Sequence, residues 1–427
     1  MRILVISQYY YPEQFRINDI CKELVKRGHK VTVLTGIPNY PEGKFYKGYG
    51  FTKKRKDIKD GVDIIRLPII PRSKNSITLI LNYISFVISG FFWSKFTNKN
   101  FDKVFIYEVS PMLQALPGVW YAKRKKIDSY IYVMDLWPES IQLVTNFNNK
   151  TILKLINKVV DYIYKNCKKI FTSSESFIEN IHKRGHSRNK LVFWPQYAEE
   201  FYKPLNRGSC RINEMNTDDF KIIFAGNIGY AQGLDIVIDT ARILKERNIK
   251  VKFYLIGNGR AKEELIKNVE ENNLQNYIKF IDKQPAAKIP EYYANADMAF
   301  ITLKKNLISD EILPAKLQSY FACGIPILGC ADGEIKQVIE KSGAGFCVES
   351  GNSEKLAEQI EKSIKLTTKE LEQMKQNSIK YYEKNYKKQM LLDKLEKEME
   401  IRKDDKNVWR ENINDYRRYW FIWTCST

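Results

Sequence analysis

The sequence predicts an α/β protein made of two doubly wound domains, and three observations lead to this prediction. Short β-branched runs alternate with longer amphipathic stretches along most of the 427 residues. Several of the short runs are apolar on both faces, as expected of strands covered by helices on two sides. The runs form two series of six, and a chain of this length has room for two or three domains.

The elements follow in order along the chain. In the first half we expect strands at Arg2–Ile6, Val31–Thr35, Val62–Arg66, Val104–Tyr107, Tyr130–Met134 and Ile170–Ser173. In the second half we expect them at Lys221–Ala225, Val251–Ile256, Ile278–Ile281, Met298–Thr302, Ile325–Cys330 and Gly345–Val348. Helical patterns lie between them, for instance Ile17–Lys26, Leu234–Glu246 and Ala261–Glu271. Strand–helix–strand repeats imply right-handed crossovers and parallel sheets.

The domain boundary falls in Tyr197–Asp219, which holds turn-forming residues and no sustained periodicity. We therefore expect domains at 1–200 and 201–375, a helical segment at 376–403 and a tail of unknown role at 404–427. The tail is basic and aromatic, and either dangles or makes an extra contact with a membrane or a partner. A ligand held between the two domains would lie at the carboxyl ends of both sheets, facing the interdomain cleft.

Composition narrows the function classes. Hydrophobic residues make up 44% and charged residues 28%, which excludes a polytopic membrane protein, a collagen-like fibre and a largely disordered chain. The formal net charge of +20 favours anionic partners: nucleic acid, acidic lipid or phosphorylated small molecules. Seven scattered cysteines indicate reduced thiols in the cytosol. His182 and His186 have ligand spacing but no carboxylate between them, so no metal site is expected.

One stretch, Ile77–Ser94, carries no charge and is just long enough to span a bilayer. A span would place the first three strands of one sheet across the membrane from the rest, which argues against it. Two interpretations stay open: a helix packed inside the domain, or one that partly inserts into a membrane surface. The basic runs Lys53–Lys56 and Lys123–Lys126 would strengthen binding to anionic lipid, although either run alone could be a solvated face.

The motifs of several dehydrogenase, nucleotidase and hydrolase classes are absent. No G-x-G-x-x-G follows the first strand, no phosphate-binding P-loop occurs, and no G-x-S-x-G elbow is present. Two strand–helix junctions in the second half are suited to an anion instead. Gly226–Gly233 lets backbone N–H groups approach a phosphate, and Asp310–Leu317 places Pro314 at the first helical position with Glu311 ahead of it. Tight turns and helix-terminal charges explain the same residues equally well.

An ordered set of blocks narrows the choice. Ala322–Ile327 (ACGIPI) resembles the strand entry of retaining glycosyltransferases of family 4, which have the GT-B architecture of two Rossmann-like domains. The resemblance extends over roughly residues 1–400, through Lys26–Val33, Gly226–Gly233, Gly257–Gly259 and Lys283–Pro285. Two further blocks, Pro38–Pro41 and Asp135–Ser140, are most similar to L-fucosamine transferases of bacterial O-antigen and capsule assembly.

The resemblance implies roles for particular residues. The expected donor-binding residues are Gly226, Asn227, Gly229, Gln232, Lys283, Leu313, Lys316 and Arg16. Glu311 and Asp135 are the catalytic candidates, although Asp135 could equally cap a helix, and Asn39, Tyr40 and Trp137 are expected to bind the acceptor. The chain also departs from the family: Ser319 replaces its second glutamate, and Asn227 and Gln232 replace the Arg and Lys that neutralise the diphosphate.

What the resemblance implies is transfer of a sugar with retention from a nucleotide-diphosphate donor, UDP-linked, to a polyprenyl-diphosphate-linked saccharide. A donor phosphate oxygen would help to remove the acceptor proton, and neither a metal nor another cofactor is expected. The enzyme would act in the cytoplasm, peripherally on an anionic inner membrane face, without nucleic acid as a partner. Two alternatives stay open: a GT-B-like sugar-nucleotide epimerase, and a non-catalytic protein that binds nucleic acid or acidic lipid.

Overall fold

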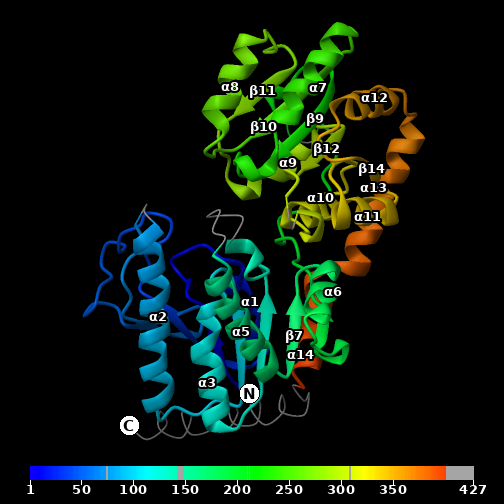
Figure 1. Cartoon of the computed structure of the whole chain (residues 1–427). Helices are drawn as coiled ribbons and strands as arrows, with labels where there is room; N and C mark the ends of the chain where they lie inside the picture. Colours follow the sequence, from blue (N-terminus) through cyan, green and yellow to red (C-terminus); the bar gives the residue numbers. More distant parts are fainter. Residues whose placement is uncertain (74–75, 142–148, 209, 211, 307–308, 401–427) are drawn as a thin grey trace, which may run out of the picture. The chain divides into compact units, whose positions relative to one another are not determined.

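The computed structural model describes residues 1–73, 76–141, 149–208, 210, 212–306 and 309–400, and the tail predicted at 404–427 lies outside them (Figure 1). The chain divides into two compact units. Unit 1 comprises Met1–Ser173, Ile178–Phe193 and residues 393–400, and unit 2 comprises Ser174–Phe177 and Trp194–Leu392. The sequence predicted a division at 200/201 and a separate helical segment at 376–403. In the structure, residues 393–400 of that segment belong to unit 1.

Unit 1 is built on an eight-stranded sheet in the order β3-β4-β2-β1-β5-β6-β7-β8. Its strands are β1 (Arg2–Ile6), β2 (Lys30–Gly36), β3 (Lys56–Lys59), β4 (Val62–Leu67), β5 (Lys103–Glu108), β6 (Ser129–Val133), β7 (Lys169–Thr172) and β8 (Leu191–Phe193). Its helices are α1 (Arg16–Lys26), α2 (Ser76–Phe96), α3 (Leu116–Lys125), α5 (Lys150–Asn166) and, from Ile178 on, α6 (Glu175–Lys183). All pairings are parallel except β3 with β4.

Unit 2 is built on a six-stranded parallel sheet in the order β11-β10-β9-β12-β13-β14. Its strands are β9 (Phe220–Ala225), β10 (Val251–Ile256), β11 (Ile278–Ile281), β12 (Met298–Thr302), β13 (Ile327–Cys330) and β14 (Gly345–Val348). Its helices are α7 (Asp235–Glu246), α8 (Lys262–Glu271), α9 (Ile289–Ala294), α10 (Ala315–Cys323), α11 (Gly333–Ser342), α12 (Ser353–Ile364) and α13 (Thr368–Asn385). Apolar clusters on both faces of the sheet explain why its strands lack a polar face.

The two doubly wound units with parallel sheets confirm the predicted fold class. The predicted cleft between the domains stays a prediction. After Ser353 the sequence pattern is helical to about Lys403, and within the described residues up to 400 it forms α12, α13 and a third helix, Lys388–Glu398. Thr367 starts α13 with a capping box: the Glu370 N–H donates to the Thr367 hydroxyl oxygen, and the Thr367 N–H donates to the Glu370 carboxylate.

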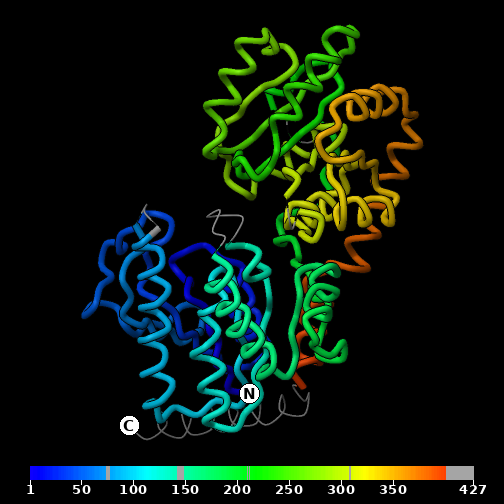
Figure 2. Tube along the Cα trace, viewed as in Figure 1, coloured from blue at the N-terminus to red at the C-terminus, as the bar shows by residue number. Residues whose placement is uncertain are grey.

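The last of these helices, α14 (Lys388–Glu398), brings the chain back to unit 1, and its course can be traced in Figure 2. Arg27 forms ion pairs with Asp393 at 2.7 Å and Glu396 at 2.8 Å. The Tyr130 hydroxyl donates to the carbonyl oxygen of Met399 at 3.2 Å. These tertiary contacts, invisible to helical periodicity, are why residues 393–400 belong to unit 1.

Candidate functional site

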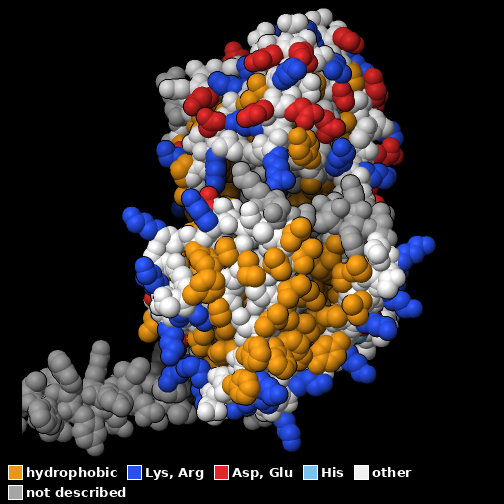
Figure 3. Space-filling model, turned by 60° about the vertical axis from the view of Figure 1, so that its left-hand side comes forward, with side chains coloured by type: hydrophobic (Ala, Val, Ile, Leu, Met, Phe, Trp, Pro, Cys, Tyr) orange, Lys and Arg blue, Asp and Glu red, His pale blue; other side chains and the backbone are white. Residues whose placement is uncertain are grey.

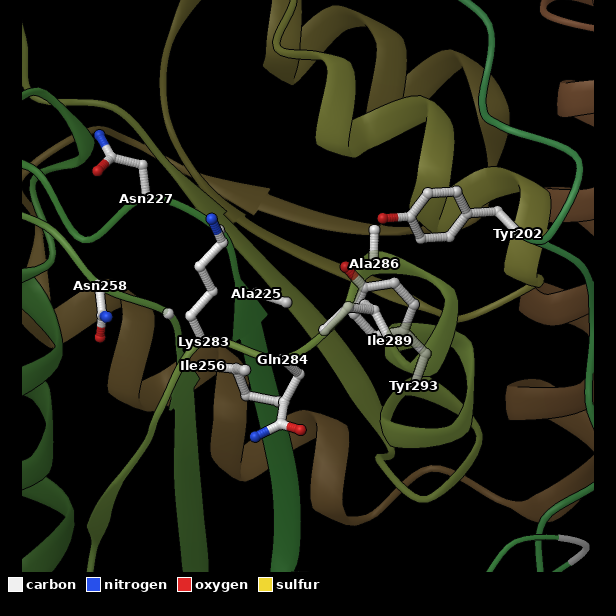
Figure 4. A pocket seen from close by; sticks show the side chains of 12 residues that line it. Tyr202, Ala225, Asn227, Ile256, Asn258, Lys283, Gln284, Ala286, Ile289 and Tyr293 are labelled. Atoms are coloured by element: carbon white, nitrogen blue, oxygen red, sulfur yellow. The ribbon is translucent and has the colours of Figure 1, made fainter. Parts of the chain in front are cut away.

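A pocket of about 380 Å³ lies at the carboxyl ends of β9, β10 and β11 in unit 2 (Figure 4). In parallel α/β sheets this edge is where ligands bind, because the loops that follow the strands converge there. The pocket is lined by Tyr202, Ala225, Gly226, Asn227, Ile256, Gly257, Asn258, Lys283, Gln284, Ala286, Ile289 and Tyr293.

Glycines let two strand ends come together at the base of this pocket. The Gly226 N–H donates to the Ile256 carbonyl at 2.9 Å, and the Ile228 N–H donates to the Asn258 carbonyl at 2.9 Å. A Cβ at Gly257 would overlap the Gly226 carbonyl oxygen, and Gly257 also has a φ of +143°. Only glycine fits there, so the backbone itself forms a wall that a ligand can approach closely.

The two ends of the pocket differ in chemistry. In Figure 4 the side chains of Asn227, Asn258 and Lys283 gather at one end, with the Lys283 ammonium pointing toward the loop that carries Asn227. Tyr202 and Tyr293 stand at the other end, with ring centroids 6.4 Å apart and ring planes at 23°. A polar end beside an aromatic end suits a ligand that is itself anionic at one end and planar at the other.

Lys316 brings a positive charge to the glycine-rich loop from α10. Its Nζ donates to Gln232 Oε1 at 2.8 Å and lies 3.6 Å from the centroid of the Phe224 ring. The same Nζ would be 3.3 Å from a Cβ built on Gly226. Burial lowers the pKa of Lys316 from 10.5 to about 7, although part of the side chain reaches solvent. A bound anion would reverse that shift, so the group is poised to gain a proton with its ligand.

The helix that carries Lys316 also begins without a side-chain cap. Pro314 is the N-cap of α10, one position earlier than predicted, and no side chain accepts from the first N–H groups. Glu311 ends the short 3₁₀ turn Ser309–Glu311 just before it. Leu313 is buried in the core of unit 2, so only its backbone is available to a ligand. Ser319 is also buried, facing the Ala315 carbonyl at 3.5 Å.

The remaining donor-site candidates of unit 2 lie around this loop. Gln232 contacts Lys316 rather than the pocket wall. Gly229 lines a separate, smaller pocket of about 110 Å³ together with Tyr230 and Lys304. The structure thus brings Gly226, Asn227 and Lys283 to one pocket, with Gln232 and Lys316 beside it and Gly229 on the other side of the loop.

In unit 1 a buried carboxyl group organises the loops after β1 and β2. Glu13 accepts hydrogen bonds from the N–H groups of Asn39 at 2.8 Å and Tyr40 at 2.7 Å through one oxygen. The Tyr10 N–H donates to the other oxygen at 3.3 Å. Burial raises the pKa of Glu13 to about 7, even though these N–H donors act in the opposite direction. Glu13 was not among the residues expected from the sequence.

Glu13 holds an aromatic surface in place. The rings of Tyr9, Phe15 and Tyr40 lie with centroids 5.2–5.6 Å apart. The Arg72 guanidinium lies 4.9 Å from the centroid of the Tyr40 ring, and the backbone N–H of Arg72 donates to Asn39 Oδ1 at 2.9 Å. Asn39 is therefore buried as a support, whereas the Tyr40 side chain is 37% exposed and able to contact a ligand.

Asp135 and Trp137 follow β6 and are joined through the loop after β5. Asp135 Oδ2 accepts from the Ser110 N–H at 3.1 Å and from the Ser110 hydroxyl at 2.7 Å, and the Trp137 indole N–H donates to the same hydroxyl oxygen at 3.0 Å. The charge of Asp135 reaches Tyr83, which also interacts with Tyr9 and Tyr40. The acceptor-site candidates and Asp135 therefore share one region of unit 1.

Arg16 is the first residue of α1, and its charge acts on the buried hydroxyls of Tyr107 and Tyr132. Beside that group lies Glu108, fully buried at the end of β5. Its carboxylate accepts from the N–H groups of Met134 and Asp135 at 3.3 and 3.4 Å. Burial, and then the charge of Asp135, hold the pKa of Glu108 well above its ordinary value.

Sequence reasoning missed several pocket residues. Asn258 and Gln284 stand in blocks that directly follow predicted strands, so their position at the strand ends was a usable signal. Tyr202 lies in the predicted linker and Tyr293 on a short helix, where neither spacing nor type distinguishes a ligand-facing aromatic residue from a core one.

Comparisons with known proteins agree with this geometry. Residues 210–381, which hold most of the pocket, match the family model of glycosyl transferases group 1. The chain is 25% identical over 435 aligned positions to WcaI of Escherichia coli (strain K12), a protein assigned to the glycosyl transferases of colanic acid biosynthesis. That alignment covers 98% of this chain and 100% of WcaI.

Solved structures resemble the fold. A glycosyltransferase from Rickettsia africae superposes with a TM-score of 0.67 at 15% identity, covering 94% of this chain and 98% of that one. Anabaena HepE in complex with UDP superposes with a TM-score of 0.67 at 13% identity, covering 93% and 99%. The architecture is that of the GT-B glycosyltransferases, two Rossmann-like α/β domains with parallel sheets. Over residues 210–381 the chain is similar, more narrowly, to the glycosyl transferases of group 1.

Proposed function

We propose that this chain transfers a sugar from a nucleoside-diphosphate donor held in the pocket of unit 2. The observation that carries the proposal is the combination at the glycine-rich loop. The Lys316 ammonium lies beside the Gly226 backbone and comes from the first turn of α10, whose start has no side-chain cap. Burial leaves this ammonium ready to be charged by a diphosphate. The aromatic end, with Tyr202 and Tyr293, takes the base.

The donor is a UDP-sugar in this proposal. Anabaena HepE has the same fold and was solved with UDP. WcaI is assigned to the glycosyl transferases of colanic acid biosynthesis. We extend both properties to this chain. The similarity of Pro38–Pro41 and Asp135–Ser140 to L-fucosamine transferases makes N-acetyl-L-fucosamine, or a related amino sugar, the first donor to test.

Unit 1 binds the acceptor, a saccharide linked to polyprenyl diphosphate in O-antigen or capsule assembly. The exposed ring of Tyr40 offers an apolar face on which a sugar ring can stack. Trp137 and Asn39, both buried, fix the loops beside that ring rather than contact the sugar. Arg72, which packs on Tyr40, adds a positive charge beside this surface. A sugar carrying a diphosphate matches that pairing of ring face and charge.

Transfer proceeds with retention, with the acceptor attacking on the face from which the diphosphate departs. A donor phosphate oxygen then takes the acceptor proton, while Lys316 and the α10 N–H groups stabilise the charge on the leaving diphosphate. Glu311 holds hydroxyl groups of the donor sugar, and Asp135 orients the acceptor. Because Lys316 supplies the neutralising charge, no metal ion is needed in this scheme.

The experiment is an assay of UDP release with purified full-length chain, a panel of UDP- and GDP-sugars, and a polyprenyl-diphosphate-linked saccharide. Release that requires both substrates, persists in EDTA and gives a retained anomeric configuration by NMR supports the proposal. Glu311→Gln should reduce turnover at least 100-fold, because one lost transition-state contact is worth about 2.7–4 kcal/mol. Conversion of donor without acceptor would instead identify an epimerase, and no release with any donor would refute sugar transfer.

A further inference from the structure

Helix α2 presents its large apolar side chains outward. Ile77 is 70% exposed, Phe96 68% and Phe92 54%, and the whole outward line is a stripe of Ile77, Ile80, Leu81, Ile84, Ile88, Phe91, Phe92 and Phe96. We call these eight residues the α2 stripe. Only 22% of the apolar window Ile77–Phe96 is buried. A surface helix of a soluble domain has the opposite arrangement, with its apolar line toward the core.

The inward face of α2 cannot exchange places with the stripe. Asn82 accepts from Gln8 Nε2 at 2.7 Å and donates to the Ile70 carbonyl at 2.6 Å, so its polar group is satisfied inside the unit. Further along the same face of α2, Gly90 packs against Pro117, where a Cβ would overlap the proline ring. Rotation of the helix would place a larger side chain against Pro117, where only Gly90 fits, and would break the Asn82 hydrogen bonds. The exposure of the stripe is therefore built into the packing.

Helices α3 and α5, which follow α2 in the packing of unit 1, add apolar side chains of their own. Trp120 of α3 packs edge-on against Phe91 with ring centroids 5.4 Å apart, and α3 in turn contacts α5. On α5, Ile152 is 44% exposed and Leu155 62%. Figure 3 shows the face that carries α2, with hydrophobic side chains gathered into one broad patch and Lys and Arg around its edge.

The charged residues of these helices are almost all basic. The segments α2, α3 and α5 contain one acidic residue, Asp161, against eight basic ones: Lys95, Lys123, Arg124, Lys125, Lys150, Lys154, Lys158 and Lys165. A broad apolar face with a basic surround is the pattern of a surface that rests on acidic headgroups. A second copy packed face to face on the stripe would instead bring two such sets of cations together.

We propose that unit 1 docks on an anionic bilayer through the α2 stripe, with α2 lying along the membrane surface over a length of about 32 Å. The apolar side chains enter the boundary between headgroups and acyl chains, and the basic residues of α2, α3 and α5 contact lipid phosphates. A transmembrane position is excluded by topology, because α2 connects β4 and β5 of one sheet and packs along α3. The proposal rests on these helices alone and does not depend on sugar transfer.

The test is flotation of the full-length chain with vesicles of phosphatidylcholine alone or with 30% phosphatidylglycerol. We expect at least tenfold tighter binding to the anionic vesicles, weakened by salt. The triple variant Ile84→Gln, Ile88→Gln, Phe92→Gln should lose at least tenfold in binding to either vesicle. A matched control, Ile58→Gln with Ile364→Gln, changes two exposed apolar side chains outside the stripe and should bind as the unaltered chain does.

A second variant separates charge from apolar contact. Lys150→Glu, Lys154→Glu, Lys158→Glu should remove the preference for anionic vesicles while its circular dichroism and melting temperature stay unchanged. Three results would overturn the proposal: no binding to anionic vesicles, undiminished binding of the stripe variant, or retention in membranes washed with alkaline carbonate, which indicates a span. A dimer in solution that the stripe variant converts to a monomer, without lipid binding, would assign the surface to a second copy instead.

Discussion

Lys316 offers a quantitative test of the donor site. Burial lowers the pKa of its ammonium to about 7, so at pH 8 only about one tenth of the unliganded molecules carry the charge. A diphosphate bound against Nζ raises this pKa back toward its ordinary value of 10.5, so the group is protonated at pH 8. Binding of UDP at pH 8 should therefore take up about 0.9 proton, and at pH 6 less than about 0.1 from this group.

The variant Lys316→Met keeps the length of the side chain and its packing on Phe224 but removes the titrating group. A hydrogen bond to a charged group contributes about 1.5–3 kcal/mol, so UDP should bind roughly 10- to 150-fold more weakly. UMP, which lacks the second phosphate, should lose less. Lys369→Met removes an exposed charge from α13 and serves as the control for net charge.

The measurement is titration calorimetry of UDP in two buffers of different ionisation enthalpy, at pH 6 and pH 8, with the unaltered chain and both variants. The buffer dependence of the heat gives the protons taken up, and titration of UDP itself cancels when Lys316→Met is subtracted. Equal proton uptake in the unaltered chain and Lys316→Met would show that Lys316 does not meet the diphosphate. Equal loss of affinity in Lys369→Met would point to general electrostatics instead.

Three further results are expected. Ala286→Trp fills the aromatic end of the pocket and should weaken UDP binding at least tenfold by calorimetry, whereas Ala287→Trp, an exposed neighbour that does not line it, should bind normally. Gly257→Ala places a Cβ against the Gly226 carbonyl and should lower the melting temperature and abolish UDP binding, while the control Gly351→Ala has positive φ but open space and should lose only stability. Glu13, whose pKa is raised to about 7, binds a proton more readily in the folded chain than in the unfolded one, so its contribution to the free energy of unfolding is complete below pH 4.5 and is lost as the pH rises through 7. Glu13→Gln should remove about 3 kcal/mol of this pH dependence, measured by urea unfolding. An unchanged pH profile would contradict the raised pKa.

Most of the fold was readable because buried parallel strands carry an unbroken apolar signal. All twelve predicted strands are present within a residue or two. The two that were missed lack that signal: β3 (Lys56–Lys59) is a charged edge strand, and β8 (Leu191–Phe193) has three residues. The break before α13 was in principle readable, since Thr367 and Glu370 have capping-box spacing. The return of residues 393–400 to unit 1 was not, because it depends on partners such as Arg27, some 366 positions away.

The candidate sites divide in the same way. In unit 2, Gly226 was predicted because it directly follows a strand, and Lys283 because its block resembles the glycosyltransferase family. The topology of a parallel sheet brings both loops to one edge. In unit 1, Glu13 and Arg72 act through backbone hydrogen bonds and ring stacking across distant loops. Nothing about a lone glutamate after the first strand distinguishes a buried organiser of two loops from a solvated charge.

The cation of the glycine-rich loop shows where matching a motif position by position misleads. Asn227 and Gln232 stand where the resembling family has Arg and Lys, so the loop read alone lacks the charge that a leaving diphosphate requires. The folded chain puts the ammonium of Lys316 on Gln232, from a helix that is 84 positions away in sequence. What a leaving diphosphate requires is an ammonium at the glycine-rich loop, whichever part of the chain carries it. Because β9 and β12 are neighbours in the sheet, the segment that follows either strand can place a lysine there. Loss of a motif cation is therefore evidence of lost catalysis only after every element that reaches the same point has been examined.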